Sequence, residues 1–300
     1  MYLLDFLKNI TKKSNIGVLI WIILNAALLT FIGGMYAEYS GSVDLWVGCL
    51  AGFALYLLSV VIALSPVGEY LLRLQQHCKK IKDPALLNRL EPLFNEVYSR
   101  AKEATPSLND NIQFFLSDDE SPNAFATGRQ TVCITKGFLA FSDEEIKGAL
   151  AHEFGHLAHK DTDIILFVAT GNLIVTGLFW IWQRVVDFFS FITAIIAGIF
   201  TKRGWGAILT AFIKRIFIDT VLSACIWLWT KIGVLICMAS SRENEFLADE
   251  YAYNLGFGNQ LANVLGKLGG SDSKGLWAAL NSSHPKTSLR IEKLQSYSQY

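Results

Sequence analysis

Residues 142–157 read Ser-Asp-Glu-Glu-Ile-Lys-Gly-Ala-Leu-Ala-His-Glu-Phe-Gly-His-Leu, and this stretch decides the fold. The serine at its start and the glutamate three residues later form a capping box, in which each side chain bonds the backbone N–H of the other residue. The pattern predicts a helix that begins at Asp143. Apolar residues then recur at helical spacing along one side, at Ile146, Ala149, Leu150 and Leu157.

The predicted helix carries His152 and His156, four residues apart, with Glu153 beside the first of them. Side chains at positions i and i+4 lie on one face of a helix, so both imidazoles can reach a single ion. Zinc held in this way lowers the pKa of a bound water to about 7, and a neighbouring carboxylate can take its proton. The chain has only five histidines, so this pairing indicates a catalytic site with one Zn²⁺ per chain rather than ordinary surface histidines.

A catalytic zinc ion needs a third protein ligand and leaves its fourth position to water. His159 is one candidate, but a helix cannot easily wrap three ligands around one ion. Glu245 is a better candidate, because residues 241–249 (Ser-Arg-Glu-Asn-Glu-Phe-Leu-Ala-Asp) resemble the start of a second helix. Asp249 follows one turn later and can orient a zinc-binding histidine without touching the metal. Alone, such a pair of carboxylates is usually a solvated helix face, but joined to the two histidines it indicates a metal site.

Two uncharged apolar runs, Ile16 to Tyr36 and Leu45 to Ser65, precede this region. Each can cross a hydrocarbon core of about 30 Å as a helix, and the short link between them predicts an antiparallel hairpin. The link carries no Lys or Arg, whereas basic residues flank the pair on both sides, so the positive-inside rule places both flanks in the cytoplasm. Gly48 and Gly52 form a GxxxG pattern that can bring two helices into contact.

A second membrane region is predicted between residues 164 and 239, with a less regular pattern. Its first apolar run is interrupted by Gln183, Arg184 and Asp187, and four basic residues follow in the link between the runs: Lys202, Arg203, Lys214 and Arg215. If the residues on both sides of this region build one site, the number of crossings between them must be even. Two crossings fit best, with part of 185–200 at the interface or re-entrant. The alternative is a helical hairpin that never spans.

Residues 67–160 are more polar and predict the soluble part of the chain. Asp83 followed by proline predicts a helix start, with the aspartate as N-cap and the proline at the first helical position. The runs Ile112 to Leu116 and Thr131 to Thr135 read as short strands.

Composition sets further bounds on the function. A mean hydropathy of +0.35 is too high for an ordinary soluble domain of 300 residues. The 26 basic and 26 acidic residues balance, so no long-range field recruits nucleic acid. The five cysteines are odd in number and form no CxxC, which fits a reducing compartment better than a disulfide framework.

These stretches together resemble the HtpX-type membrane zinc metalloproteases, relatives of the prenyl-protein (CAAX) processing zinc proteases. The resemblance covers nearly the whole chain. It rests on Pro-Asn-Ala-Phe-Ala at 122–126, on 151–161 with its His-Glu-Phe-Gly-His, on Ser-Arg-x-x-Glu-x-x-Ala-Asp at 241–249, and on His284-Pro285. It implies a mainly α membrane protein with about four transmembrane helices. It also implies an α+β, gluzincin-like zinc protease domain with a small sheet.

We expect four parts along the chain. Residues 1–66 form an N-terminal transmembrane hairpin, and 67–163 form the first part of a cytoplasmic protease domain. Residues 164–239 form the second membrane region, and 240–300 complete the protease domain with the third zinc ligand.

The resemblance also assigns roles to single residues. It implies that Glu245 rather than Glu243 is the third ligand. It places Asn123 in an edge strand or adjoining loop, where an extended substrate can add main-chain hydrogen bonds; the alternative is a simple turn residue. It places His284 at the active site, where it stabilises the oxyanion of the tetrahedral intermediate; the alternative is a histidine that merely precedes a helix opened by Pro285.

The expected function is a membrane-bound zinc endopeptidase in which Glu153 activates the zinc water and later protonates the leaving amine. The resemblance implies polypeptide substrates, among them misfolded or damaged membrane proteins, and a lipid bilayer as partner. It further implies a bacterial inner membrane, with the active site facing the cytoplasm. A second interpretation is site-specific processing of a prenylated or signal-bearing peptide. A third is a non-catalytic membrane scaffold with structural zinc, against which Glu153 argues because a structural site needs no base.

Overall fold

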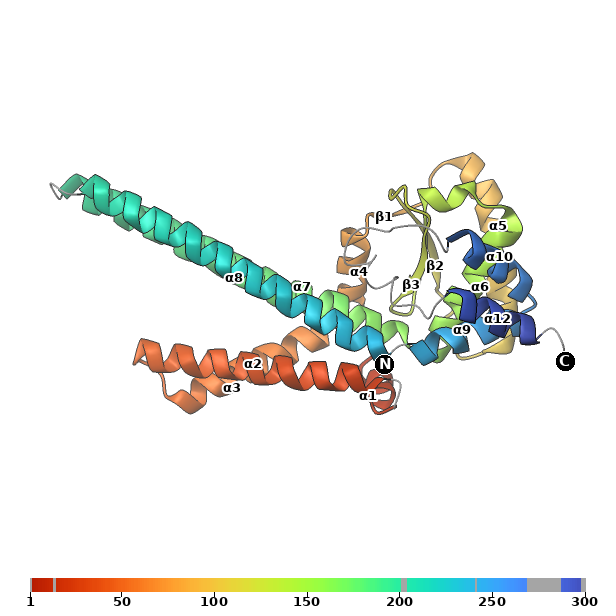
Figure 1. Cartoon of the computed structure of the whole chain (residues 1–300), viewed down its shortest axis with the longest axis horizontal. Helices are drawn as coiled ribbons and strands as arrows, with labels where there is room; N and C mark the ends of the chain where they lie inside the picture. Colours follow the sequence, from red (N-terminus) through yellow and green to blue (C-terminus); the bar gives the residue numbers. More distant parts are fainter. Residues whose placement is uncertain (1, 13–14, 201–203, 241, 269–286, 298–300) are drawn as a thin grey trace.

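The computed structural model describes residues 2–12, 15–200, 204–240, 242–268 and 287–297. Two pairs of long helices lead away from a compact part that holds a small sheet and most of the other helices (Figure 1). The predicted class, mainly helical with a small sheet, is therefore confirmed.

The first pair, α2 (Ile16–Ser40) and α3 (Leu45–Ala63), is the predicted N-terminal hairpin. In the described part of the chain these two helices are long and apolar enough to cross a membrane. They meet through glycines: a Cβ on Gly48 would lie 2.4 Å from the carbonyl oxygen of Gly33, and one on Gly52 would lie 2.1 Å from a backbone oxygen of α2. Residues with side chains cannot come so close, so the predicted GxxxG contact is confirmed.

The second pair, α7 (Thr162–Phe200) and α8 (Gly204–Ser240), runs antiparallel and diverges from the first (Figure 1). With a rise of about 1.5 Å per residue, the 39 residues of α7 extend about 58 Å, nearly twice the thickness of a hydrocarbon core. Of the two alternatives expected for part of 185–200, the re-entrant piece is wrong, because α7 continues as one helix through this range. A position at the membrane interface stays a prediction. Arg184 and Asp187 lie 3.5 Å apart on the surface of α7, so the polar interruption is accommodated without ending the helix.

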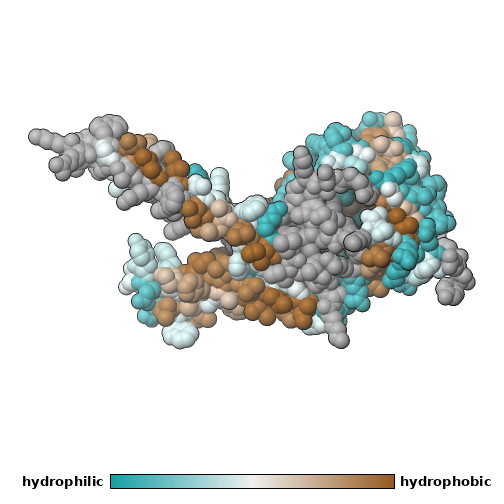
Figure 2. Space-filling view, viewed as in Figure 1, coloured by the Kyte–Doolittle hydropathy of each residue, from teal (hydrophilic) through white to brown (hydrophobic). Residues whose placement is uncertain are grey.

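Apolar side chains remain exposed along both helix pairs, whereas the compact part is largely hydrophilic on the face shown in Figure 2. Exposed apolar surface of this extent marks contact with a membrane or a partner. The largest exposed side chains on the two pairs include Phe31, Trp46, Trp180, Phe188, Phe189 and Trp227.

A mixed four-stranded sheet has the order β1-β2-β4-β3, in which β2 and β4 are parallel and the other neighbours antiparallel. The two predicted strands are confirmed as β2 and β4. The short β1 was not predicted, and an edge strand next to Asn123 was expected from the family resemblance alone, because neither segment has an alternating apolar pattern. β3 is an edge strand. The bounds are β1 (Cys78–Lys80), β2 (Gln113–Ser117), β3 (Ala124–Thr127) and β4 (Thr131–Thr135).

The helix predicted from residue 143, α6 (Asp143–His159), packs against β3 and against α5, α9 and α10. The capping box is present: the Ser142 hydroxyl accepts from the Glu145 N–H at 3.3 Å, and the Glu145 carboxylate accepts from the Ser142 N–H at 3.0 Å. Because other elements surround α6, its apolar residues lie at the centre of the core of the compact part. The remaining bounds are α1 (Tyr2–Ile10), α4 (Pro66–Gln75), α5 (Pro84–Ala104), a 3-10 turn (Lys136–Ala140), α9 (Arg242–Asn254), α10 (Gly258–Leu268) and α12 (Thr287–Tyr297).

The turn between β3 and β4 is held by elements that adjoin the membrane helices. Glu69 of α4 is 1% exposed and accepts hydrogen bonds from the N–H groups of Gln130 (3.0 Å) and Arg129 (3.3 Å) and from the hydroxyl of Thr131 (2.6 Å). Arg129 also pairs with Asp163, in the first turn of α7, at 2.8 Å. The position of the edge strand is thus tied to α4, which follows the α2–α3 pair, and to α7.

Candidate metal centre

His152 and His156 lie one turn apart on α6 and are almost fully buried. Their Nε2 atoms are 3.1 Å apart, and their rings stand nearly perpendicular at 86°. The helical spacing noted in the sequence therefore brings both imidazoles to one point.

Glu245 of α9 completes the group. Its carboxylate oxygens lie 3.5 Å from His152 Nε2 and 3.6 Å from His156 Nε2. Within the described residues, these three side chains form a cluster in which one ligand atom from each lies within 4.8 Å of the others. His159 is outside this cluster, and its ring packs edge-on against Tyr251 at 5.9 Å. The residues expected to bind zinc are thus the ones that converge.

A glycine allows α9 to come this close to α6. A Cβ on Gly155 would lie 2.8 Å from Ala248 Cα and 3.0 Å from the Ala248 carbonyl oxygen. Real side-chain carbons keep greater distances from backbone atoms. Gly155 therefore sets the separation of the two helices that carry the three clustered side chains.

Each of the two imidazoles has a carboxylate within hydrogen-bond distance of its Nδ1 atom. Asp249 lies 2.9 Å from His152 Nδ1, as expected from the sequence, and Asp161 lies 3.0 Å from His156 Nδ1. Such partners fix the tautomer and orientation of a metal-binding histidine. The role of Asp161 was not predicted. It becomes possible because Lys160, with φ of 61°, ends α6 in the left-handed conformation and turns the chain back toward the histidine.

Arg290 of α12 was also not predicted as part of the site. It is 4% exposed and donates two hydrogen bonds to the Asp249 carboxylate, at 2.8 and 2.6 Å, and its guanidinium lies 3.4 Å from Glu245. Burial alone would raise the pKa of Asp249, but Arg290 and His152 outweigh it and lower that pKa to about 2. No local pattern could reveal this contact, since it joins residues that only the tertiary fold brings together.

Glu153 points from α6 toward the edge strand, where its carboxylate accepts a hydrogen bond from the Ala126 N–H at 2.7 Å. It is 8% exposed, and burial raises its pKa despite the neighbouring imidazoles. A carboxylate with a raised pKa beside a metal site is suited to accept and return a proton.

Asn123 directly precedes the edge strand, and its backbone C=O accepts from the Thr135 N–H at 2.9 Å. This hydrogen bond places residue 123 next to β4, so the alternating residues Ala124 and Ala126 turn their main-chain groups away from β4, to the side on which Ala126 donates to Glu153. His284 lies outside the described residues.

The three clustered side chains fit a zinc ion in chemistry and charge. Two imidazole nitrogens and one carboxylate oxygen are a donor set of catalytic zinc. Burial opposes a charge on His156, but Asp161, Glu245 and Glu153 outweigh it and raise the pKa of His156 to about 10. The position thus favours positive charge, which a divalent cation would supply.

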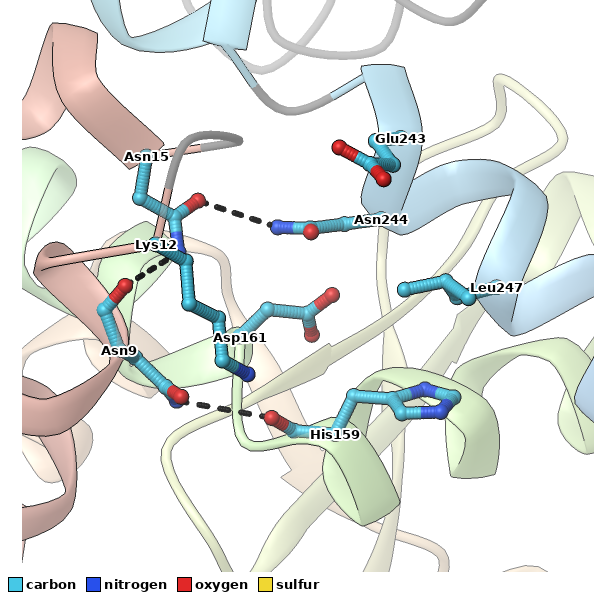
Figure 3. Close-up of a pocket in the computed structure, with 8 residues that line it drawn as sticks. All are labelled: Asn9, Lys12, Asn15, His159, Asp161, Glu243, Asn244 and Leu247. Carbon is cyan, nitrogen blue, oxygen red and sulfur yellow. Dashed lines mark hydrogen bonds between the residues drawn. The ribbon is translucent and has the colours of Figure 1, made fainter.

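A pocket of about 310 Å³, lined mostly by polar and charged residues, adjoins the centre between the N-terminal segment and the first turn of α9 (Figure 3). Asp161 belongs to both the pocket and the centre. The lining residues are Asn9, Lys12, Asn15, His159, Asp161, Glu243, Asn244 and Leu247.

Two histidines one turn apart, a carboxylate from a second helix and a glutamate beside the first histidine make this a centre of the metallopeptidase type. The chain belongs to peptidase family M48, whose model matches residues 86–298. The resemblance to HtpX-type membrane metalloproteases is thereby confirmed.

Several relatives carry the name protease HtpX homolog. The protein of Bacillus subtilis (strain 168) is 25% identical over 322 residues, with 98% of each chain covered. The protein of Tropheryma whipplei (strain Twist) is 29% identical over 208 residues, which cover 61% of this chain and 65% of that protein. The match thus spans slightly less than two thirds of the Tropheryma protein. The crystal structure of S. mikatae Ste24p aligns with a TM-score of 0.41 and 19% identity, covering 93% of this chain and 64% of that one.

Proposed function

We propose that this chain is a membrane-bound, zinc-dependent endopeptidase that hydrolyses peptide bonds with Glu153 as general base. The convergence of His152, His156 and Glu245 beside Glu153 carries the proposal. Membership of peptidase family M48 supports it.

The mechanism follows from the positions of the side chains. Zinc, when bound by the two histidines and Glu245, supplies a Lewis acid for the attacking water and the peptide carbonyl. Glu153 takes the proton of that water and later gives it to the leaving amine. The carboxylates of Asp249 and Asp161 hold the two imidazoles in orientation. For His284, the family resemblance rather than a described position supports the role of donor to the oxyanion.

We propose that the substrate adds as a strand along the edge of β3 that faces away from β4. The main-chain groups of Ala124 and the Ala126 carbonyl face this edge, whereas the Ala126 N–H donates to the Glu153 carboxylate. Asn123, at the start of the edge strand, contributes further contacts to the peptide. Binding through the backbone fits an enzyme that accepts many sequences, as removal of misfolded or damaged membrane proteins requires.

We further propose four membrane crossings, by α2, α3, α7 and α8, in a bacterial inner membrane. An even number of crossings leaves residues 67–163 and 240–300, the two parts of the protease domain, on the same side. The basic flanks of the 1–66 hairpin favour the cytoplasm as that side. The 164–239 region then forms the second hairpin.

Two alternative functions would give results different from those of a general endopeptidase. A site-specific processing protease would cleave one prenylated or signal-bearing peptide and leave unfolded proteins intact. A membrane scaffold would hold zinc and cleave nothing.

The deciding experiment measures zinc content and hydrolysis of an unfolded protein by the detergent-purified chain. We expect one zinc per chain in the wild type and in Glu153→Gln, with cleavage by the wild type alone. Glu245→Gln should lose zinc. The matched control is Glu243→Gln, which changes an exposed glutamate two residues away on the same helix and should keep both zinc and activity. Equal cleavage by the wild type and Glu153→Gln would refute the mechanism.

A further inference from the structure

The N-terminal segment before the first membrane helix reaches the metal centre. Asn15 is the N-cap residue of α2, but its side chain makes no capping hydrogen bond to that helix. It is 2% exposed. Asparagine at an N-cap normally bonds the backbone N–H groups of the first turn. Here the side chain is used for contacts with other parts of the chain.

Those contacts link three elements through asparagine side chains (Figure 3). The Asn15 amide nitrogen donates to the Asn9 carbonyl at 2.8 Å, and its oxygen accepts from the Asn244 amide at 3.3 Å. The Asn9 amide in turn donates to the Lys160 carbonyl at 2.8 Å. A continuous set of hydrogen bonds therefore runs from α9 through the N-terminal segment to the turn between α6 and α7.

Each end of this set adjoins a residue of the metal centre. Asn244 immediately precedes Glu245 on α9. Lys160 immediately precedes Asp161, which pairs with His156. The left-handed backbone at Lys160 is costly for a residue with a side chain, and the hydrogen bond from Asn9 to its carbonyl helps to hold that conformation.

The two ends are distant in the chain, because the α7–α8 pair separates α6 from α9. Asn9, Asn15 and Asn244 are buried and line one pocket together with Asp161, the partner of His156. Buried polar networks that are fully hydrogen-bonded fix the relative positions of the elements they join.

We propose that Asn15 is a positioning residue of the metal centre, through which the N-terminal segment holds Glu245 and the His156–Asp161 pair in register. The inference rests on the proposed zinc site and adds to it a part of the chain outside residues 86–298, which the family model matches. Asn15 does not touch the metal. It acts on the two elements that carry the ligands.

The test compares Asn15→Ala with Asn25→Ala on the full, detergent-purified chain. Asn25 is a matched control, because it is a buried asparagine of the same membrane helix with two hydrogen bonds, to the Trp21 carbonyl at 2.8 Å and from the Trp229 indole at 3.1 Å. Both variants lose two hydrogen bonds, but Asn25 has no link to the ligands. The zinc dissociation constant is measured by competition with a chromogenic chelator, alongside thermal unfolding.

We expect Asn15→Ala to raise the zinc dissociation constant about 3- to 10-fold, somewhat less than removal of a residue that directly contacts a ligand. Excess zinc should restore its cleavage rate, and Asn25→Ala should bind zinc like the wild type. Asn244→Ala, which breaks the set at its other end, should weaken zinc binding in the same direction and serves if Asn15→Ala does not fold.

Equal zinc affinity in Asn15→Ala, Asn244→Ala and the wild type would overturn the inference. So would equal loss in Asn15→Ala and Asn25→Ala, since that would reflect stability alone. If the wild type binds no zinc, the proposed function fails and this inference fails with it.

Discussion

Gly155 meets Ala248 where α6 crosses α9, and an alanine at position 155 would place its Cβ 2.8 Å from Ala248 Cα. The second close neighbour is the Ala248 carbonyl oxygen at 3.0 Å. Both are backbone atoms, so no side-chain rotation can relieve the overlap. The two helices must move apart.

The required movement can be estimated from contact distances. Carbon atoms in ordinary contact are about 3.5–4.0 Å apart, so the helices must separate by about 1 Å. Metal–ligand distances tolerate changes of about 0.2 Å. Because α9 carries Glu245, we expect Gly155→Ala to weaken zinc binding and to lower cleavage about 100-fold. Overpacking costs about 1–3 kcal/mol, and the gain of about 0.5–1 kcal/mol from replacing glycine in a helix offsets part of it.

The assay measures zinc affinity, cleavage and denaturant unfolding for Gly155→Ala and a matched control, Gly266→Ala. Gly266 lies in helix α10, and a Cβ there would meet nothing within 4 Å. The control should gain about 0.5–1 kcal/mol in unfolding free energy and keep zinc and activity. Zinc binding and cleavage at wild-type levels in Gly155→Ala would refute the claim that this contact sets the geometry of the site.

Three other perturbations give further predictions. Asp161→Asn removes the charged partner of His156 and should raise the zinc dissociation constant about 10- to 100-fold in the chelator assay, whereas an unchanged constant would show that the contact is dispensable. Glu69→Gln leaves one acceptor oxygen for three donors and should lower the unfolding free energy by about 1–3 kcal/mol in urea; no loss would contradict its role in holding the β3–β4 turn. The pKa of Asp249 is lowered from 3.8 to about 2, so its ionised form contributes about 2 kcal/mol of stability above pH 4 that is lost as the pH falls through 2. Urea unfolding across this range should show the loss, and Arg290→Met should abolish most of it.

Local sequence patterns predicted the helices that depend on local signals such as a helix cap or an uncharged apolar run. The capping box at Ser142 and Glu145 gave the start of α6 correctly, and Asp83 gave the start of α5. The uncharged runs gave α2 and α3 within a few residues. The edge strand β3 was expected only from the family resemblance, because four residues of mostly small side chains carry no periodic signal and depend on pairing with β4. The re-entrant alternative at 185–200 was wrong because hydropathy registers Arg184 and Asp187 only as a polar interruption, whereas the two side chains pair on the surface of α7.

The residues of the candidate site also differ in whether local sequence patterns predicted them. His152, His156 and Glu153 are close in sequence, and helical spacing alone predicted that the two histidines converge. Glu245 required a second helix and a resemblance to a known family. Arg290 could not be found, because its contact with Asp249 is created by the docking of α12.

The helices α7 and α8 separate α6 from α9 in the chain, and this order affects how the site forms during synthesis. His152 and His156 are made before these two helices, and Glu245 is made after them. At about 5–20 residues per second, the ribosome needs on the order of ten seconds to cover that interval. During this time the nascent chain carries the histidine helix without its third ligand. In the proposed topology, chain order alone therefore keeps the peptidase inactive until α7 and α8 have been synthesised and the chain has returned to the cytoplasmic side.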